Sequence, residues 1–396
     1  MILTARQESG LRIAISRYKT HEAYTTISGY AGTGKSTLIK FIISALNLSP
    51  EQVCYVAYTG KAAQVLKQKG CPNPITAHKL LYVAKPMPNG TYKFEAKSTL
   101  DNDYEIIVVD EVSMLPKEMW EQLLSHKIHV IACGDPFQLP PINKESDNHV
   151  LDKPHIFLDE IMRQAYDSEI IRFSMWIREG KPIHNFPASN QQVMLIHPYE
   201  TVSGMYTWAD QILCSTNAQR NALNQYVRQL KGFEKNPQIG DRIISLHNQW
   251  EFFSMNPADP SPLTNGSIGT IQKMFLTSLT VPYWISKEAI PVLYATMLDE
   301  NGDTFSRIPI DYTALTTGEK FLTGNQEYQM RKNKKCNTPP FEFAYAYAIT
   351  CHKSQGSEWN KVLVKEEKFP YDKTEHARWA YTAATRASEK LVWIKL

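Results

Sequence analysis

Three kinds of sequence feature are scarce or missing from this chain of 396 residues. Its six cysteines are scattered and form no C-x-x-C pair, so we expect reduced thiols and neither a disulfide framework nor a zinc site. No apolar run approaches the roughly 18 residues that span a membrane, and the N-terminus lacks the apolar region of a signal peptide. These absences predict a soluble, cytoplasmic protein without a membrane partner.

A strong charge of one sign is also missing. The 43 Lys and Arg residues nearly balance the 40 Asp and Glu residues, which leaves a net charge of +3. Any contact with nucleic acid must therefore come from a local basic surface. The hydrophobic share of 43% suits an ordinary core, and a chain of this length is expected to hold more than one domain.

A phosphate-binding loop is the most informative motif that is present. Gly29 to Thr37 reads GYAGTGKST, the G-x-x-x-x-G-K-[ST] pattern. Glycines let backbone N–H groups curl around phosphate oxygens. Lys35 offers a mobile charge to the β- and γ-phosphates, and the Ser36 hydroxyl suits Mg²⁺. A β-rich segment, Tyr24 to Ser28, precedes the loop, and a helix over Thr37 to Leu46 follows it. The pattern predicts a site for a nucleoside triphosphate with magnesium.

Two adjacent carboxylates follow a second buried strand. Ile106 to Val109 is a continuous apolar run, as expected for a parallel strand. Asp110 then emerges at the carboxyl end, where open α/β sheets place their ligands. We expect Asp110 to hold the magnesium and Glu111 to act as the general base that orients the attacking water.

Polar residues follow further predicted strands. Val53 to Ala57 reads as a strand that runs into Thr59, Gly60 and Lys61 at a helix N-terminus. Such a position can hold an anion of a second ligand. His78 lies at a turn in the segment ITAHKLL. For His78, as for Thr76 and Lys79 beside it, a helix cap or a solvated charge remains the alternative.

A hairpin is predicted around Asn89-Gly90, because this dipeptide favours a type I′ turn. Its flanks are Leu80 to Met87 and Thr91 to Ala96, and the pair is too small to form a domain. Tyr92 and Phe94 alternate with charges in the second flank. They either pack locally or stack on bases.

The N-terminal segment Leu3 to Arg17 reads as a helix with Thr4 as its cap and Gln7 at its third position, a capping-box pattern. The alternative is that the Gln7 amide, which offers both a donor and an acceptor, reads the edge of a base. The residues alone do not decide between these two roles.

Two cations and one amide are candidates for sensing the γ-phosphate. Val130 to Cys133 reads as a buried strand that leads to Gln138, which could sense the phosphate or the attacking water. Arg163 lies in the segment LDEIMRQ, and Arg386 follows a helix near the C-terminus. Either arginine could stabilise charge that develops on the γ-phosphate.

A second α/β unit is predicted from about Ile212, with Asn217 at a turn before a helix. From about Gln272 to Pro340 the pattern changes to short strands with frequent turns, which suggests a small β-barrel-like insert. The α/β pattern then returns, and Thr350, His352 and Lys353 cluster at one strand end. Two P-loop-like halves are therefore implied, of which only the first carries a phosphate loop. Such an arrangement suits a translocation motor.

The motifs occur in a recognisable order: GYAGTGKST, AYTGKAAQVL, TAHKLL, VVDEVSM, GDPFQLPP, LDEIMRQ, TNAQRNALN, TCHKSQGSEW and YTAATRA. In this order the chain resembles the superfamily 1 helicases of the RecD and Dda type. The resemblance implies an ATP-dependent helicase that moves 5′ to 3′ on single-stranded DNA and unwinds duplex. It implies an α/β fold with RecA-like domain 1A over residues 1–165, which includes a hairpin pin at about 82–104. Domain 2A would cover 166–271 and 341–396, and an SH3-like domain 2B would cover 272–340.

The resemblance also implies roles for individual residues. ATP would be bound by Gln7, which would contact adenine, and by Gly29, Gly32, Thr33, Gly34, Lys35, Ser36, Thr37, Gly356 and Glu358. Ser36 and Asp110 would hold Mg²⁺. Catalysis would use Lys35, Asp110, Glu111, Gln138, Arg163 and Arg386. Nucleic acid would be contacted by Thr59, Gly60, Lys61, His78, Tyr92, Phe94, Asn217, Thr350, His352 and Lys353.

Two departures and two alternative functions stand beside this resemblance. Tyr58 replaces the proline that relatives commonly have before the threonine of the second motif, and almost nothing precedes Leu3. We therefore expect a compact, phage-like, monomeric helicase, in the host cytoplasm if phage-encoded, with a single-strand-binding or replication protein as a further partner. The alternatives are a motor that remodels protein on nucleic acid without unwinding, and a P-loop kinase. Glu111, which suits water activation, disfavours the kinase.

Overall fold

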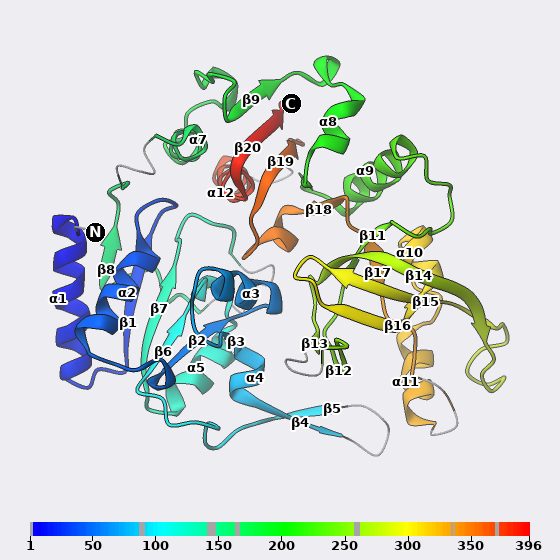
Figure 1. The fold of residues 1–396 in the computed structure, drawn as a ribbon, viewed down its shortest axis with the longest axis horizontal. Coiled ribbons are helices and arrows are strands. Elements are labelled where there is room, and N and C mark those ends of the chain that lie inside the picture. Colours follow the sequence, from blue (N-terminus) through cyan, green and yellow to red (C-terminus); the bar gives the residue numbers. More distant parts are fainter. Residues whose placement is uncertain are drawn as a thin grey trace. The chain divides into compact units, whose positions relative to one another are not determined.

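The computed structural model describes residues 3–86, 92–140, 148–162, 167–256, 262–333, 336, 338–368 and 372–396. The chain forms two compact units (Figure 1). The first comprises Met1–Tyr82, Ala96–Ser215 and Thr350–Leu396, and the second comprises Val83–Glu95 and Thr216–Ile349. No described helix is both long and apolar enough to cross a membrane.

The first unit contains a six-stranded parallel sheet with the strand order β3-β2-β6-β7-β1-β8. Four of its strands are buried along almost their whole length, as strands covered on both faces should be. The strands are β1 (Tyr24–Gly29), β2 (Val53–Ala57), β3 (Ile75–Thr76), β6 (Ile106–Val109), β7 (His129–Gly134) and β8 (Ile156–Leu158).

Helices cover both faces of this sheet, and alternate residues of one strand feed two separate cores. Ile106 and Val108 of β6 pack with residues of α1, α2 and α3. Ile107 and Val109 pack on the opposite face with α4 and α5. This period of two is what a strand produces when it is buried on both sides. The helices are α1 (Ala5–Lys19), α2 (Lys35–Ala45), α3 (Gly60–Gln68), α4 (Ala77–Leu81) and α5 (Lys117–Ser125).

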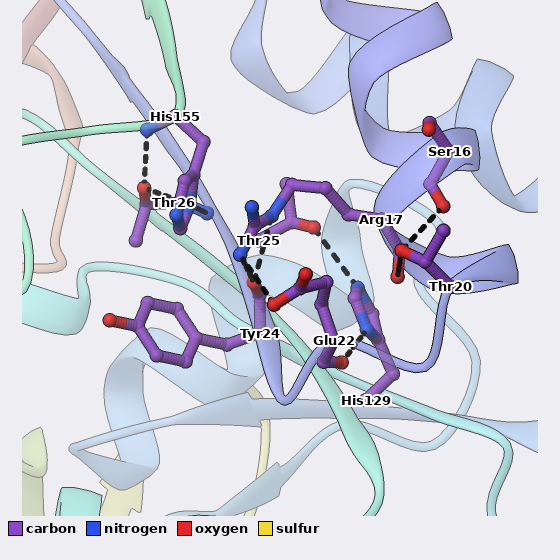
Figure 2. Close-up of polar contacts among 9 residues, drawn as sticks. All are labelled: Ser16, Arg17, Thr20, Glu22, Tyr24, Thr25, Thr26, His129 and His155. Carbon is purple, nitrogen blue, oxygen red and sulfur yellow. Dashed lines mark hydrogen bonds and ion pairs between the residues drawn. The ribbon is translucent and has the colours of Figure 1, made fainter.

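A polar network closes the amino-terminal edge of the sheet, opposite the edge where ligands are expected (Figure 2). The Arg17 guanidinium donates to the carbonyl of Tyr24 at 3.0 and 3.2 Å. His129 Nδ1 lies 2.7 Å from the carbonyl of Glu22, and its Nε2 lies 3.1 Å from the Thr25 hydroxyl. Because a carbonyl only accepts, Nδ1 carries the proton and Nε2 accepts from Thr25. Burial lowers the pKa of His129, which favours this neutral form.

A second sheet has the strand order β18-β10-β19-β20-β9, in which the pairs β10–β19, β19–β20 and β20–β9 are parallel. The start of α7 is tied to β9 because the buried Glu169 carboxylate accepts from the backbone N–H groups of Ser189, Gln192 and Val193. The strands are β9 (Val193–Ile196), β10 (Gln211–Cys214), β18 (Ala348–Thr350), β19 (Trp359–Lys365) and β20 (Ala387–Ile394). The accompanying helices are α7 (Glu169–Arg178), α8 (Ser203–Trp208), α12 (Lys373–Ala384) and the 3-10 turn η6 (Cys351–Ser354).

The second unit is built on an antiparallel sheet with the order β16-β15-β14-β11-β17. Near residue 346 the chain leaves this sheet, and the buried Asn224 satisfies the interrupted backbone through Tyr345 O, Ala348 O and Ala348 N. The strands are β11 (Arg242–Ser245), β14 (Ile268–Leu279), β15 (Ile290–Asp299), β16 (Thr304–Asp311) and β17 (Phe343–Tyr345), with the pair β12 (Gln249–Phe253) and β13 (Pro262–Leu263). The helices are α9 (Asn217–Leu230), α10 (Tyr312–Thr317) and α11 (Gly324–Lys332).

The strands of the predicted hairpin are β4 (Tyr82–Pro86) and β5 (Tyr92–Ala96), which form a two-stranded sheet. The Asn89-Gly90 turn lies outside the described residues, as do the side chains of Tyr92 and Phe94. The pin and the SH3-like insert therefore stay predictions, as do the proposed domain boundaries.

Candidate active site

The phosphate loop joins β1 to α2, and its glycines are required by close packing. A Cβ at Gly29 would lie 2.7 Å from Thr33 Oγ1, and Gly34 has a φ of +79°. The left-handed turn at Gly34 starts α2 at Lys35, two residues earlier than the sequence pattern suggests. The Lys35 ammonium donates to the carbonyls of Gly29 and Tyr30 at 2.7 and 3.0 Å, so it lies across the loop.

Gln7 has a clear structural role. Its Oε1 accepts from Thr4 N–H, and its own N–H donates to Thr4 Oγ1, which completes the predicted capping box of α1. Its Nε2 also donates to the carbonyl of Thr33 at 3.2 Å, and the side chain is 1% exposed. Gln7 therefore supports the phosphate loop from behind, while its contact with adenine stays a prediction.

The carboxylate pair lies at the end of β6. Burial and the neighbouring Glu111 charge raise the pKa of Asp110 to about 6, although Lys35 and Lys69 oppose this shift. Glu111 adopts a left-handed conformation, with a φ of +51°. Its Oε1 accepts from Gln138 Nε2 at 3.4 Å, whereas its Oε2 is buried without a hydrogen-bond partner among the described residues. A buried carboxylate oxygen of this kind suits a water or a metal-bound group that arrives with the substrate.

The predicted metal ligands Ser36 and Asp110 line the same cavity, which has a volume of about 620 Å³. Both offer oxygen atoms, the ligands that Mg²⁺ prefers, and Mg²⁺ usually takes only one or two protein ligands beside phosphate and water. Lys69 also lines this cavity. The donor set therefore fits a magnesium ion delivered with a triphosphate.

Of the two arginines predicted to contact the γ-phosphate, the structure describes only Arg386. Arg163 lies outside the described residues. Arg386 is 5% exposed, and its guanidinium donates to the carbonyls of Thr382 and Ser357 and to the Thr385 hydroxyl. In this structure Arg386 therefore braces the end of α12, and its contact with the γ-phosphate stays a prediction.

A third arginine, which the sequence analysis missed, lies against the phosphate loop. The Arg178 guanidinium carbon lies 3.6 Å from the centre of the Tyr30 ring. Its Nη1 is buried and has no hydrogen-bond partner among the described residues. Nothing in the local sequence marks Arg178, because it is simply the last residue of the amphipathic helix α7.

The loop after β7 holds a further residue that the sequence analysis did not select, and α12 holds its partner. The Tyr381 hydroxyl donates to Asp135 Oδ2 at 2.6 Å and accepts from Ala31 N–H at 2.8 Å. Asp135 directly follows a buried strand, as Asp110 does, so the rule that located Asp110 could have located Asp135. No such rule was available for Tyr381, since its partners are distant in sequence.

Several candidate nucleic-acid residues pack together in the first unit. Thr59 caps α3 by accepting from Ala62 N–H, and its contact with nucleic acid stays a prediction. Lys61 Nζ lies 4.5 Å from the centre of the Trp359 ring. Gly356 fits against α3, since a Cβ there would lie 2.8 Å from Ala62 Cβ. The start of α3, which includes Gly60, therefore packs against the segment between η6 and β19.

The remaining candidates have distinct surroundings. The His78 ring lies 5.9 and 6.0 Å from the rings of Tyr58 and Tyr82. Burial lowers the pKa of His78 and also that of His352. His352 and Lys353 lie on η6, directly after Thr350. Asn217 begins α9 in the second unit.

Glu358, the predicted ribose contact, forms an ion pair with Lys69 at 3.8 Å. Both side chains are about half exposed, so this pair adds little to stability. Lys69 also lines the cavity of Ser36 and Asp110, so Glu358 is paired with a residue of that cavity. Its contact with ribose stays a prediction.

The phosphate loop, the buried carboxylate pair and the two parallel α/β sheets define a P-loop nucleoside triphosphatase. The AAA domain family matches residues 3–197, and the UvrD-like helicase C-terminal domain family matches residues 345–394. These two matches cover the two parts of the chain that meet at the loop.

Similar proteins extend this classification. The ATP-dependent DNA helicase dda of Enterobacteria phage T4 is 31% identical over 35% of this chain and 33% of its own length. The ATP-dependent RecD2 DNA helicase of Deinococcus radiodurans is 26% identical over 92% of this chain and 46% of its own length. Our chain thus spans less than half the length of these two helicases. An uncharacterised protein of Acanthamoeba polyphaga mimivirus is 25% identical over 94% of this chain and 95% of its own length.

Two solved structures share the fold. The Pif1 helicase from Candida albicans has a TM-score of 0.53 at 20% identity, and the match covers 100% of this chain and 95% of that one. The Bacteroides Pif1 helicase in complex with ADP-AlF3 and ssDNA has a TM-score of 0.54 at 18% identity, with coverages of 99% and 92%. The chain thus carries an AAA domain and a UvrD-like helicase C-terminal domain, and its named relatives are the superfamily 1 ATP-dependent DNA helicases Dda, RecD2 and Pif1. The predicted family and the α/β fold with two RecA-like halves are confirmed.

Proposed function

We propose that the chain moves along single-stranded DNA in the 5′ to 3′ direction and unwinds duplex, driven by hydrolysis of Mg-ATP. The observation that carries this proposal is that two helices distant in sequence from the phosphate loop, α7 and α12, both contact it. Ala31 N–H donates to Tyr381, and the Tyr30 ring contacts Arg178. A loop that contacts α7 and α12 can convert a change of bound nucleotide into a movement of these helices relative to the loop.

The chain's own residues would divide the chemistry of hydrolysis. Lys35 would bind the β- and γ-phosphates, while Ser36 and Asp110 would hold Mg²⁺, which neutralises charge on the transferred phosphoryl group. Glu111 would accept the proton of the attacking water, and Gln138, already bonded to Glu111, would position that water. Arg163 and Arg386 would stabilise the charge that develops on the γ-phosphate.

Single-stranded DNA is proposed to lie along the N-terminus of α3 and the segment from Thr350 to Lys353. Helix N-termini and lysines suit phosphates. Of the solved structures with a similar fold, one is the Bacteroides Pif1 helicase in complex with ADP-AlF3 and ssDNA, and another concerns DNA unwinding at forked dsDNA by two coordinating Pif1 helicases. The β4–β5 hairpin is proposed as the strand-separating pin. We also propose a cytoplasmic monomer, with a single-strand-binding or replication protein as a further partner.

The test is ATP hydrolysis with single-stranded DNA, with RNA and without a polymer, followed by unwinding of forked duplexes with a 5′ or a 3′ tail. We expect hydrolysis to require single-stranded DNA and unwinding to require the 5′ tail. The Lys35→Ala variant should bind single-stranded DNA but hydrolyse almost no ATP, because the charge on the β- and γ-phosphates is lost. Full hydrolysis without any polymer would overturn the proposal and favour the kinase alternative.

The non-unwinding motor predicts a different outcome in the same assay. It would hydrolyse ATP with single-stranded DNA yet fail to separate either fork. Substitution of Tyr92 and Phe94 by Ala separates the two possibilities further. If both changes leave unwinding intact, the hairpin is not the pin.

A further inference from the structure

The Tyr381 hydroxyl is the point where three segments of the first unit meet. It accepts from Ala31 N–H in the phosphate loop at 2.8 Å and donates to Asp135 Oδ2, after β7, at 2.6 Å. Tyr381 itself lies on α12 and is 1% exposed. One buried hydroxyl on α12 therefore links this helix to the phosphate loop and to the end of the central strand β7.

The other contacts around Tyr381 involve the segment after β7 and not the phosphate loop. From α12, Thr382 Oγ1 accepts from Leu139 N–H at 2.9 Å. Outside α12, Gln355, directly after η6, donates from Nε2 to the carbonyl of Leu139 at 2.7 Å. The Phe137 ring packs edge-on against the Tyr381 ring, with centres 5.2 Å apart. The contacts of Thr382 and Tyr381 fix α12 to the segment after β7, and the Gln355 contact fixes the end of η6 to the same segment. Among the described hydrogen bonds of α12, the one to Ala31 reaches the phosphate loop itself.

A phosphate oxygen can compete with the Tyr381 hydroxyl for the hydrogen bond that Ala31 N–H donates. Backbone N–H groups of a phosphate loop are the donors that cradle phosphate, and Ala31 belongs to this loop. An ionised phosphate oxygen is a stronger acceptor than a neutral hydroxyl, by roughly a factor of two in hydrogen-bond energy. A triphosphate that draws on Ala31 N–H would weaken the link to α12. The bond to Asp135 would remain, so the hydroxyl would keep one partner.

We propose that Tyr381 is a positioning residue that reports the occupancy of the phosphate loop to α12 and so couples nucleotide binding to DNA binding. This inference rests on the proposed function. Coupling between two sites is reciprocal, so loss of the hydroxyl must weaken the effect of each ligand on the other. The ring contact with Phe137 remains in Tyr381→Phe, which confines the change to one oxygen atom.

The experiment measures the affinity of single-stranded DNA with and without a non-hydrolysable ATP analogue. For the wild type we expect the two affinities to differ by about 5- to 150-fold, the usual range for coupled sites. In Tyr381→Phe the ratio should fall to within about twofold of one. A merely structural role would weaken both affinities together and leave their ratio unchanged.

Two further variants complete the test. Tyr18→Phe is the matched control, since it also removes a hydroxyl that bonds a carboxylate, Glu105, but at the opposite edge of the sheet. It should keep the wild-type ratio. Asp135→Asn should lower the ratio of the two DNA affinities. The double variant with Tyr381→Phe should have the same ratio as Tyr381→Phe alone, because both changes act on the hydrogen bond between Tyr381 and Asp135.

The outcomes separate this inference from the proposed function. If the wild type binds single-stranded DNA and shows the nucleotide effect while Tyr381→Phe keeps it, the inference alone is wrong. If the wild type does not bind single-stranded DNA, the proposed function is wrong and the inference falls with it. Folding of each variant is checked by circular dichroism before binding is measured.

Discussion

Glu111 is held in an unusual backbone conformation. Its φ of +51° belongs to the left-handed region, which costs a non-glycine residue about 1–2 kcal/mol. The structure retains this strain beside Asp110, with one carboxylate oxygen bonded to Gln138 and the other without a described partner. Such strain is common where a side chain must take a particular direction for catalysis.

For Glu111→Gln we expect ATP binding to persist while hydrolysis falls by about 10²- to 10⁴-fold, the usual contribution of a general base. The amide keeps the size of the side chain but accepts protons poorly. Filter binding of ATP and a single-turnover hydrolysis assay measure the two effects separately. A rate within a few-fold of the wild type would assign the base to another residue.

At the residue scale, the sequence predicted positions better than partners. Asp110 and Thr59 were located correctly after buried strands, since a run of apolar residues marks where a parallel strand ends. The left-handed turn at Glu111 was not predicted, because side-chain identity favours it only weakly. The contacts of Tyr381 and Arg178 join residues that lie more than a hundred positions apart in the sequence, and one sequence without its fold does not reveal them.

Among the elements, the buried strands were predicted well and the helix starts less well. β2 and β6 have the predicted bounds, because continuous apolar runs begin and end sharply. α2 starts two residues before the predicted point, since the glycine of the motif turns the chain into the helix. The same local geometry governs Gly356, which brings the segment after η6 against α3.

Gly356→Ala tests this approach of two elements. The residue has a φ of +71°, and its new Cβ would lie 2.8 Å from Ala62 Cβ. Gly180→Ala is the matched control, because Gly180 has a φ of +70° and no atom lies within 4 Å of the place that its new Cβ would take. Both variants lose about 1–2 kcal/mol from backbone strain, and Gly356→Ala loses about 1–3 kcal/mol more from overpacking.

Thermal unfolding measures this difference, and single-stranded DNA affinity provides a second readout. Gly356→Ala should weaken DNA binding because it displaces α3 from the segment that carries His352 and Lys353, whereas Gly180→Ala should not. Equal destabilisation by the two substitutions would show that α3 adjusts without cost. Adding Ala62→Gly should restore part of the loss in Gly356→Ala.

At the scale of the whole molecule, the chain is divided into two units that are not continuous in sequence. Each has its own sheets and its own buried core, so we expect two unfolding transitions. Gly356→Ala should shift the transition of the first unit. A carboxylate of the second unit, Glu342, offers the complementary test.

Glu342 is bonded to His247 at 2.9 Å and to Lys320 at 3.1 Å. The hydrogen bond from His247, aided by Lys320, lowers the pKa of Glu342 from 4.5 to about 2. A carboxyl whose pKa is lower in the folded state stabilises that state above its ordinary pKa, and this stabilisation disappears as the pH falls. Glu342→Gln should therefore lower the unfolding temperature of the second unit at about pH 6, and the difference from the wild type should shrink between pH 4.5 and 2.

Calorimetry at a series of pH values measures this effect, with Glu319→Gln as the control. Glu319 belongs to the same unit and forms no ion pair among the described residues. Its substitution should leave both transitions in place at every pH. A difference for Glu342→Gln that persists undiminished at about pH 2 would mean that packing, and not charge, is responsible.

The position of Lys35 has a consequence for the pace of the catalytic cycle. Its ammonium already has two carbonyl acceptors within the loop, Gly29 and Tyr30. When the cleaved phosphate departs, the charge can return to these acceptors and is never stranded without a partner. We therefore expect these two acceptors to lower the cost of product release, so that the loop proposed to bind the triphosphate would also assist the departure of its product.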